Sequence, residues 1–203
     1  PDNPDTYNIT PDDRQIIGNT NPKHTGGLNL SAVYKNLDIS LFFNWVYGND
    51  VYNANKIQFT TQWKKDYYNM LSVMSSANRF RYMDDAGNKI TDMEQLRTLN
   101  ENATIWSPAM KIPVLHSWAI EDGSFLRLNN ITIGYTLPTK WTKRVLINRC
   151  RVYCTVNNVF VWTKYSGFDP EVSTCLSTPL TPGVDFSSYP KARTFTLGAN
   201  ITF

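Results

Sequence analysis

Residues 37–47 read Leu-Asp-Ile-Ser-Leu-Phe-Phe-Asn-Trp-Val-Tyr, a stretch in which every second side chain is large and apolar. This alternation predicts a β-strand with one continuous apolar face. The residues that form this face at its centre are Leu37, Ile39, Leu41, Phe43 and Trp45. Residues 27–35 alternate in the same way, and Lys35-Asn36 between the two runs predicts a tight hairpin.

Three further strands are predicted at residues 125–137, 150–162 and 193–203. The first half of 125–137 alternates less regularly, and Asn129-Asn130 is a candidate β-bulge. The last strand is the most regular of the five. Its apolar side consists of Phe195, Leu197, Ala199, Ile201 and Phe203. The pattern therefore predicts an all-β fold of five antiparallel strands.

The connections between these strands differ greatly in length. The hairpin at 35–36 and the turn at 138–149 are short, whereas 48–124 and 163–192 are long. In an up-and-down meander both long loops leave the same end of the sheet, together with residues 1–26. Short periplasmic turns and long extracellular loops are typical of transmembrane β-barrels, so the long loops are expected outside the cell.

The composition of the second face favours the membrane barrel over a soluble β-sandwich. That face is rich in Thr, Asn, Ser and Gly, whereas a solvated sandwich face carries many charged residues. Trp45, Tyr47, Tyr135 and Trp162 stand near strand ends, where aromatic girdles meet the membrane interfaces. A soluble glycan-binding β-sandwich is the alternative. Since a barrel needs about eight strands, the chain is expected to complete a larger barrel or to assemble with others.

Composition excludes several other classes of protein. The chain has 203 residues, with 20 Lys and Arg against 17 Asp and Glu, so it has no excess of charge for a nucleic-acid partner. Aromatic residues make up 13% of the chain, which argues against disorder. No apolar run approaches the roughly 20 residues of a membrane-spanning helix.

Residue patterns that would indicate catalysis or metal binding are weak. The acidic pairs Asp84-Asp85 and Glu121-Asp122 lie in predicted loops, where adjacent carboxylates are usually solvated. His24 and His116 have no neighbouring ligands at metal-binding spacing. Cys150 and Cys154 would lie about 13 Å apart on one strand face, too far for a disulfide. No enzyme activity and no metal site are predicted.

Several short motifs follow one another in order along residues 16–203. They are Ile17-Gly18-Asn19-Thr20-Asn21-Pro22, Tyr34-Lys35-Asn36-Leu37-Asp38, Phe125-Leu126-Arg127-Leu128-Asn129-Asn130, Asn157-Asn158-Val159-Phe160 and Thr163-Lys164-Tyr165-Ser166-Gly167-Phe168-Asp169-Pro170-Glu171. In this order and spacing the chain resembles the C-terminal part of SusC/RagA-type TonB-dependent outer-membrane transporters. The resemblance implies a plugged barrel of about 22 strands, of which these would be the last five. The plug domain and the TonB-contacting segment would be absent from this chain.

The resemblance also implies a function and partners. The function is TonB-dependent import of oligosaccharides or oligopeptides across the bacterial outer membrane, with a SusD-like surface lipoprotein as a lid. The last strand, ending on Phe203, would carry the barrel-assembly signal. Many members have a Gly-rich acidic loop resembling a calcium site. Here residues 2–14 lack that glycine, so no cofactor is expected and calcium is a disfavoured alternative.

The long loop 48–124 is unusually aromatic. Its candidate contact residues are Trp63, Tyr67, Tyr68, Tyr82, Trp106 and Trp118. Residues 58–77 are expected to form a short helix with Trp63, Tyr67 and Met70-Leu71 on one face. Loops on a rigid barrel commonly carry binding residues, so these aromatics are candidates for contact with substrate or lid. Packing of the loop on itself is the alternative.

Overall fold

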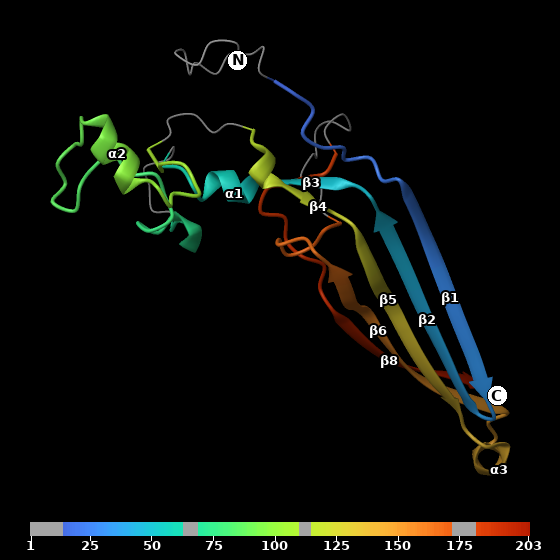
Figure 1. Cartoon of the computed structure of the whole chain (residues 1–203). Coiled ribbons are helices and arrows are strands. Elements are labelled where there is room, and N and C mark those ends of the chain that lie inside the picture. Colours follow the sequence, from blue (N-terminus) through green and yellow to red (C-terminus); the bar gives the residue numbers. More distant parts are fainter. Residues whose placement is uncertain (1–13, 63–68, 110–114, 172–181) are drawn as a thin grey trace.

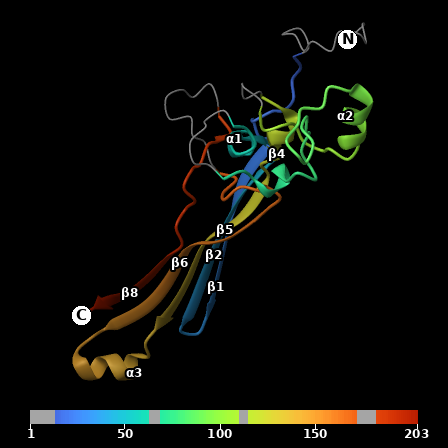
Figure 2. The ribbon, with the colours of Figure 1, turned by 90° about the vertical axis from the view of Figure 1, so that its left-hand side faces the viewer.

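The computed structural model describes residues 14–62, 69–109, 115–171 and 182–203. These residues form a long, twisted sheet with a layer of loops and short helices at one end (Figure 1). The opposite end carries the short connections, one of which contains a short helix, and the C-terminus (Figure 2). None of the described helices is long and apolar enough to cross a bilayer.

The sheet is an antiparallel meander in which consecutive long strands are neighbours. Its order is β1 (His24–Tyr34), β2 (Leu37–Tyr47), β5 (Phe125–Thr136), β6 (Arg149–Thr163) and β8 (Thr194–Thr202). All five predicted strands are present within three residues of their expected ends. Lys35 has a φ of 54° and forms the predicted hairpin turn between β1 and β2.

One face of the sheet is apolar across all five strands. Leu41 lies between Leu30 of β1 and Ile131 of β5, and Val156 of β6 lies opposite Phe195 of β8. The predicted apolar side chains therefore share one face, as the pairing register shows for Leu37, Ile39, Leu41, Phe43 and Trp45 on β2 and for Phe195, Leu197, Ala199 and Ile201 on β8. This face is open, and 82% of the Leu197 surface is exposed. No other sheet of the described residues packs against this face.

The other face is held by a network of uncharged polar side chains. Asn130 donates to Asn157 at 2.7 Å, and Asn157 donates to Thr194 at 3.1 Å, so one row of bonds links three strands. Asp38 of β2 and Arg151 of β6 form a bidentate ion pair across β5. Only glycine fits beneath this pair, because a Cβ on Gly134 would lie 2.3 Å from the guanidinium.

A bulge interrupts the sheet where the sequence pattern becomes irregular. Leu128 and Asn130 bond to consecutive residues of β2, so Asn129 is the extra residue. Asn158 on β6 has a φ of 53°, a left-handed conformation that Asn tolerates better than most residues. Because of the extra residue, even-numbered side chains of β5 point to the apolar face before the bulge and odd-numbered side chains point to it after the bulge. This change brings Leu128 and Ile131 onto one side and explains the broken alternation.

The loop end contains a second, smaller sheet. It consists of β4 (Ile120–Asp122), β3 (Asp50–Asn53) and β7 (Val184–Asp185), with β3 and β7 parallel. The short helices of this layer are α1 (Ala54–Gln58), η2 (Ser72–Met74), α2 (Met93–Leu99) and η3 (Ser117–Ala119). Buried Val51, Ile57 and Ala119 form part of its core. At the other end of the long sheet, the turn folds into α3 (Thr139–Thr142) and η4 (Lys143–Val145).

The expected helix at residues 58–77 is wrong in its described part. Helix α1 already ends at Gln58, and Leu71 is extended, with a ψ of 147°. Thr60 donates its hydroxyl to the Lys56 carbonyl at 2.8 Å, a local bond that competes with continued helix. The Leu71 amide then donates to the Phe59 carbonyl, so the chain doubles back.

Deleting Asn129 should disrupt the sheet, because removal of the extra residue moves Arg127 to the apolar face and Leu128 to the polar one. We expect most of the folded fraction of the intact protein to be lost, as measured by circular dichroism and protease resistance. Asn129→Ala is the matched control, since it keeps the bulge and loses only the bond to Asn44, worth about 1 kcal/mol. Equal folding of both variants would show that the bulge does not set the register.

Candidate functional site

Glu121 joins the two long loops into one layer. Its carboxylate accepts hydrogen bonds from Asn53 at 3.1 Å and from the amide and hydroxyl of Ser166, both at 2.8 Å. The Lys56 ammonium lies 3.0 Å away. Burial opposes ionisation, but these donors outweigh it and hold the pKa of Glu121 below its ordinary value. Glu121 is therefore charged at neutral pH and ties loop 163–192 to both ends of loop 48–124.

A buried tyrosine makes a second link within loop 163–192. The Tyr165 hydroxyl donates to Asp185 of β7 at 2.6 Å, and both residues are buried. Burial, followed by the bond to Asp185, raises the pKa of Tyr165 well above its ordinary value. The neutral phenol is therefore a permanent donor, and it fixes the strand that pairs with β3.

Arg127 fastens this layer to the long sheet. It projects from the polar face of β5 and is 1% exposed. Its guanidinium donates to Asp169 and to the bulged Asn158, each at 2.5 Å. Glu171 lies 3.4 Å from Arg127 Nε and also pairs with Lys191. A buried charge is tolerated only when it is paired and hydrogen-bonded, so these contacts hold the loop firmly against the strands.

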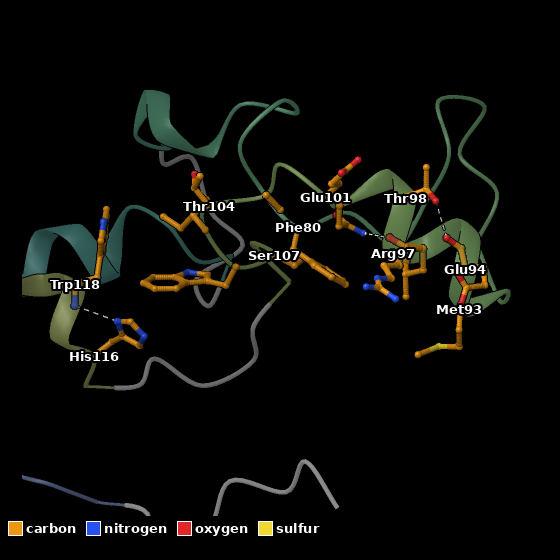
Figure 3. A pocket seen from close by; sticks show the side chains of 15 residues that line it. Phe80, Met93, Glu94, Arg97, Thr98, Glu101, Thr104, Ser107, His116 and Trp118 are labelled. Atoms are coloured by element: carbon orange, nitrogen blue, oxygen red, sulfur yellow. Dashed lines mark hydrogen bonds between the residues drawn. The ribbon is translucent and has the colours of Figure 1, made fainter. Parts of the chain in front are cut away.

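An open hollow of about 1330 Å³ lies between η3 and α2 (Figure 3). Aromatic side chains form one end of it. The Trp106 ring meets His116 at 5.2 Å and Trp118 at 5.3 Å, both edge-on, while the Lys56 ammonium lies 4.7 Å from the centre of Trp118. The backbone amide of Trp118 donates to His116 Nδ1, which fixes the imidazole.

Charged side chains of α2, together with Glu101 just after the helix, form the other end of the hollow. Glu94, Arg97 and Glu101 line it beside the hydrophobic Phe80 and Met93 (Figure 3). Asp92 caps α2 by accepting from the Glu94 amide, which sets the position of this wall. One end therefore offers flat apolar surface and the other offers charges of both signs. This combination suits reversible binding of a polar ligand that also has apolar parts.

The described ranges contain no cluster of three His, Cys, Asp or Glu side chains that would suit a metal ion. Asp169 and Glu171 surround a buried arginine rather than a cleft. The acidic segment 2–13 lies outside the described residues.

Comparisons with known proteins agree with this architecture. No family model matches the chain. TonB-dependent receptor P3 of Formosa agariphila is 31% identical over 200 residues, covering 96% of this chain and 18% of the relative. TonB-dependent receptor SusC of Bacteroides thetaiotaomicron is 32% identical over 141 residues, covering 65% of this chain and 13% of SusC. The RagAB peptide importer in its open-open state is similar in structure, with a TM-score of 0.66 and 25% identity over 98% of this chain and 19% of that chain.

The chain belongs to the SusC/RagA-type TonB-dependent receptors. It spans between about an eighth and a fifth of the length of these relatives, 13% of SusC and 19% of the RagAB chain. Its antiparallel sheet is part of an outer-membrane β-barrel. A second structure of the RagAB peptide transporter shares the fold, with a TM-score of 0.69 at 23% identity.

The hollow of this SusC/RagA-type chain brings together two of the predicted contact residues, Trp106 and Trp118. Tyr82 lines a separate, smaller hollow of about 440 Å³. The other three candidates, Trp63, Tyr67 and Tyr68, lie outside the described residues. Sequence reasoning missed Phe80 and the charged wall of α2. The capping pattern Asp92-x-Glu94 was the available signal for that helix.

Replacing Arg127 with Met should loosen loop 163–192 of this receptor. The substitution leaves the Asp169 carboxylate buried without its charged partner, which costs about 3–5 kcal/mol. We expect faster hydrogen exchange in residues 182–192 and a lower unfolding temperature of the full receptor. Arg81→Met is the control, because its pair with Asp85 is exposed and worth about 0.5 kcal/mol or less. Equal exchange in the two variants would contradict the anchoring role.

Proposed function

We propose that this chain forms part of the wall and outer mouth of a transporter that imports oligosaccharides or oligopeptides across the bacterial outer membrane, driven through TonB. The observation that carries the proposal is the pairing of an open apolar face, in register over five strands, with a loop layer that holds a wide hollow at one end. The complete barrel would have about 22 strands and an N-terminal plug.

The apolar face is proposed to meet lipid. A soluble sandwich would cover such a face with a second sheet, whereas the only other sheet of the described residues, β4-β3-β7, lies in the loop layer at one end (Figure 1). At the loop end the face carries Trp45, whose indole donates to His24, and Tyr47, which stacks on His24 at 5.1 Å. Trp162 lies in the same region. Aromatic side chains with a polar tip suit the boundary between hydrocarbon and water.

The long loops are proposed to lie outside the cell and to bind both substrate and a SusD-like lipoprotein lid. The three links through Glu121, Tyr165 and Arg127 give the loop layer the rigidity that a binding surface needs. The hollow supports contact with sugars through its aromatic end and with peptides through both ends.

Leu41→Arg tests the lipid-facing proposal. An arginine on the lipid side near mid-membrane should destabilise the assembled barrel by about 2–4 kcal/mol. Ser40→Arg is the matched control, since it places the same charge one residue away on the polar face. The measurement is unfolding of the full receptor in lipid bilayers, and equal loss in both variants would refute the assignment.

Uptake assays test the transport proposal. In a strain that depends on this receptor, uptake of a labelled oligosaccharide pool or a labelled peptide pool should require TonB. The double variant Trp106→Ala/Trp118→Ala should take up the imported pool roughly tenfold less well at limiting concentration, because two aromatic contacts are lost. Phe168→Ala is the control, since this side chain is 81% exposed and lies outside the hollow.

Three outcomes of these assays have distinct meanings. Unchanged uptake without TonB would refute the transport mechanism. TonB-dependent uptake that both variants support equally would remove only the hollow from the binding surface. Uptake of one pool alone identifies the substrate class.

A further inference from the structure

The turn that joins β5 to β6 is strongly basic. Residues 138–149 contain Lys140, Lys143, Arg144 and Arg149 and no acidic side chain. Among the described ion pairs none involves Lys140, Lys143 or Arg144. The carboxylate at this end of β2, Asp38, is already occupied by Arg151. Three cationic side chains are therefore left without a counter-ion among residues 14–62, 69–109, 115–171 and 182–203.

The same turn exposes large apolar side chains. Helix α3 buries Thr142, which is 4% exposed, whereas Trp141 is 62%, Val145 63% and Leu146 86% exposed. The apolar Trp141, Val145 and Leu146 are interspersed with the basic Lys140, Lys143 and Arg144, so both kinds of side chain leave one short turn. A turn surrounded only by water would be polar, and exposed apolar groups of this kind mark a contact surface.

The position of the turn in the sheet indicates which surface it contacts. The Leu137 amide bonds to the Cys150 carbonyl, and Cys150 lies opposite Ile201 on the apolar face. The turn thus continues the face that belongs to the membrane wall, at the end opposite the loop layer (Figure 1). Tyr34 and Tyr135 stand on that face near the same end, and the Lys35 ammonium lies 5.3 Å from the Tyr34 ring centre.

We propose that residues 139–147 form a lipid-binding turn that inserts Trp141, Val145 and Leu146 into the membrane interface. There Lys140, Lys143 and Arg144 bind the phosphate groups of anionic phospholipids. Basic side chains beside an interfacial apolar helix are a recurring means of holding anionic headgroups. The ligand is a phospholipid of the leaflet at the turn end, which is the periplasmic leaflet in the orientation proposed above. The site is independent of what the receptor transports.

Lipid titration of the full receptor tests this site. The receptor is purified in an uncharged detergent and titrated with phosphatidylglycerol or with phosphatidylcholine, and bound lipid is counted by native mass spectrometry. Wild type should prefer phosphatidylglycerol, and added salt should weaken that binding. Lys140→Gln/Lys143→Gln/Arg144→Gln should lower the phosphatidylglycerol affinity of the site roughly 100-fold, because each basic group contributes about a factor of five.

Two further variants serve as controls. Arg14→Gln/Lys89→Gln/Lys164→Gln removes the same charge at the loop end and should bind phosphatidylglycerol as wild type does. Lys140→Arg/Lys143→Arg keeps the charge and should retain the affinity, which separates lipid binding from damage to the fold.

Three results would overturn the proposal. One is equal binding of the two lipids by wild type, and another is equal loss of phosphatidylglycerol affinity in both triple variants. The third is selective binding of lipopolysaccharide with no preference for phosphatidylglycerol. All three readouts are made in detergent, so failure of the transport or orientation proposal leaves them interpretable.

Discussion

A strand that crosses a bilayer must satisfy all of its backbone hydrogen-bonding groups with other strands, because hydrocarbon offers no partners. The five long strands meet this requirement among themselves by pairing in chain order, from the Lys35 hairpin to the last pair, β6 and β8. Among the described residues the outer edges of β1 and β8 have no partner strand, so the rest of a barrel would have to pair with them. Once the strands are paired, alternation places one set of side chains on each face. The apolar set can then face lipid while the Asn and Thr set forms its own hydrogen-bond network.

The loop layer holds long connections in a fixed shape although its apolar core is small. It relies on buried polar links rather than on apolar packing alone. Arg127 reaches from the strand wall to Asp169, and Glu121 accepts from Asn53 and Ser166, which lie in different loops, and pairs with Lys56. Such a link stabilises the layer only while both partners are present, because a buried charge that loses its partner destabilises the fold. The links through Glu121 and Tyr165 join segments of the layer that carries the aromatic hollow, and Arg127 connects that layer to the strand wall.

The two ends of the sheet are chemically different. The loop end has acidic and basic residues in mutual contact, as in the Glu121 cluster. The turn end has basic residues without such partners, placed beside exposed apolar ones. A wall with this asymmetry would meet a different surface at each end, with a wide ligand-binding opening at one and lipid headgroups at the other.

The sequence by itself determined the strands, their order and their apolar face, because a two-residue period is a local property that neighbouring residues report directly. It also pointed to a bulge at Asn129-Asn130, since one extra residue breaks that period, and the strand pairing then identified Asn129 as the extra residue. Tertiary structure decided the loop layer. The pair Arg127 and Asp169 joins residues 42 positions apart, and the Thr60 hydroxyl bond helps to end a helix that the aromatic spacing favoured. The Trp106 ring contacts His116 and Trp118, which lie 10 and 12 positions further along the chain, only in the folded loop layer. Contacts of this kind depend on which residues, distant in the sequence, pair with a buried charge or pack against one another. The local alternation of apolar residues carries no information about those pairs.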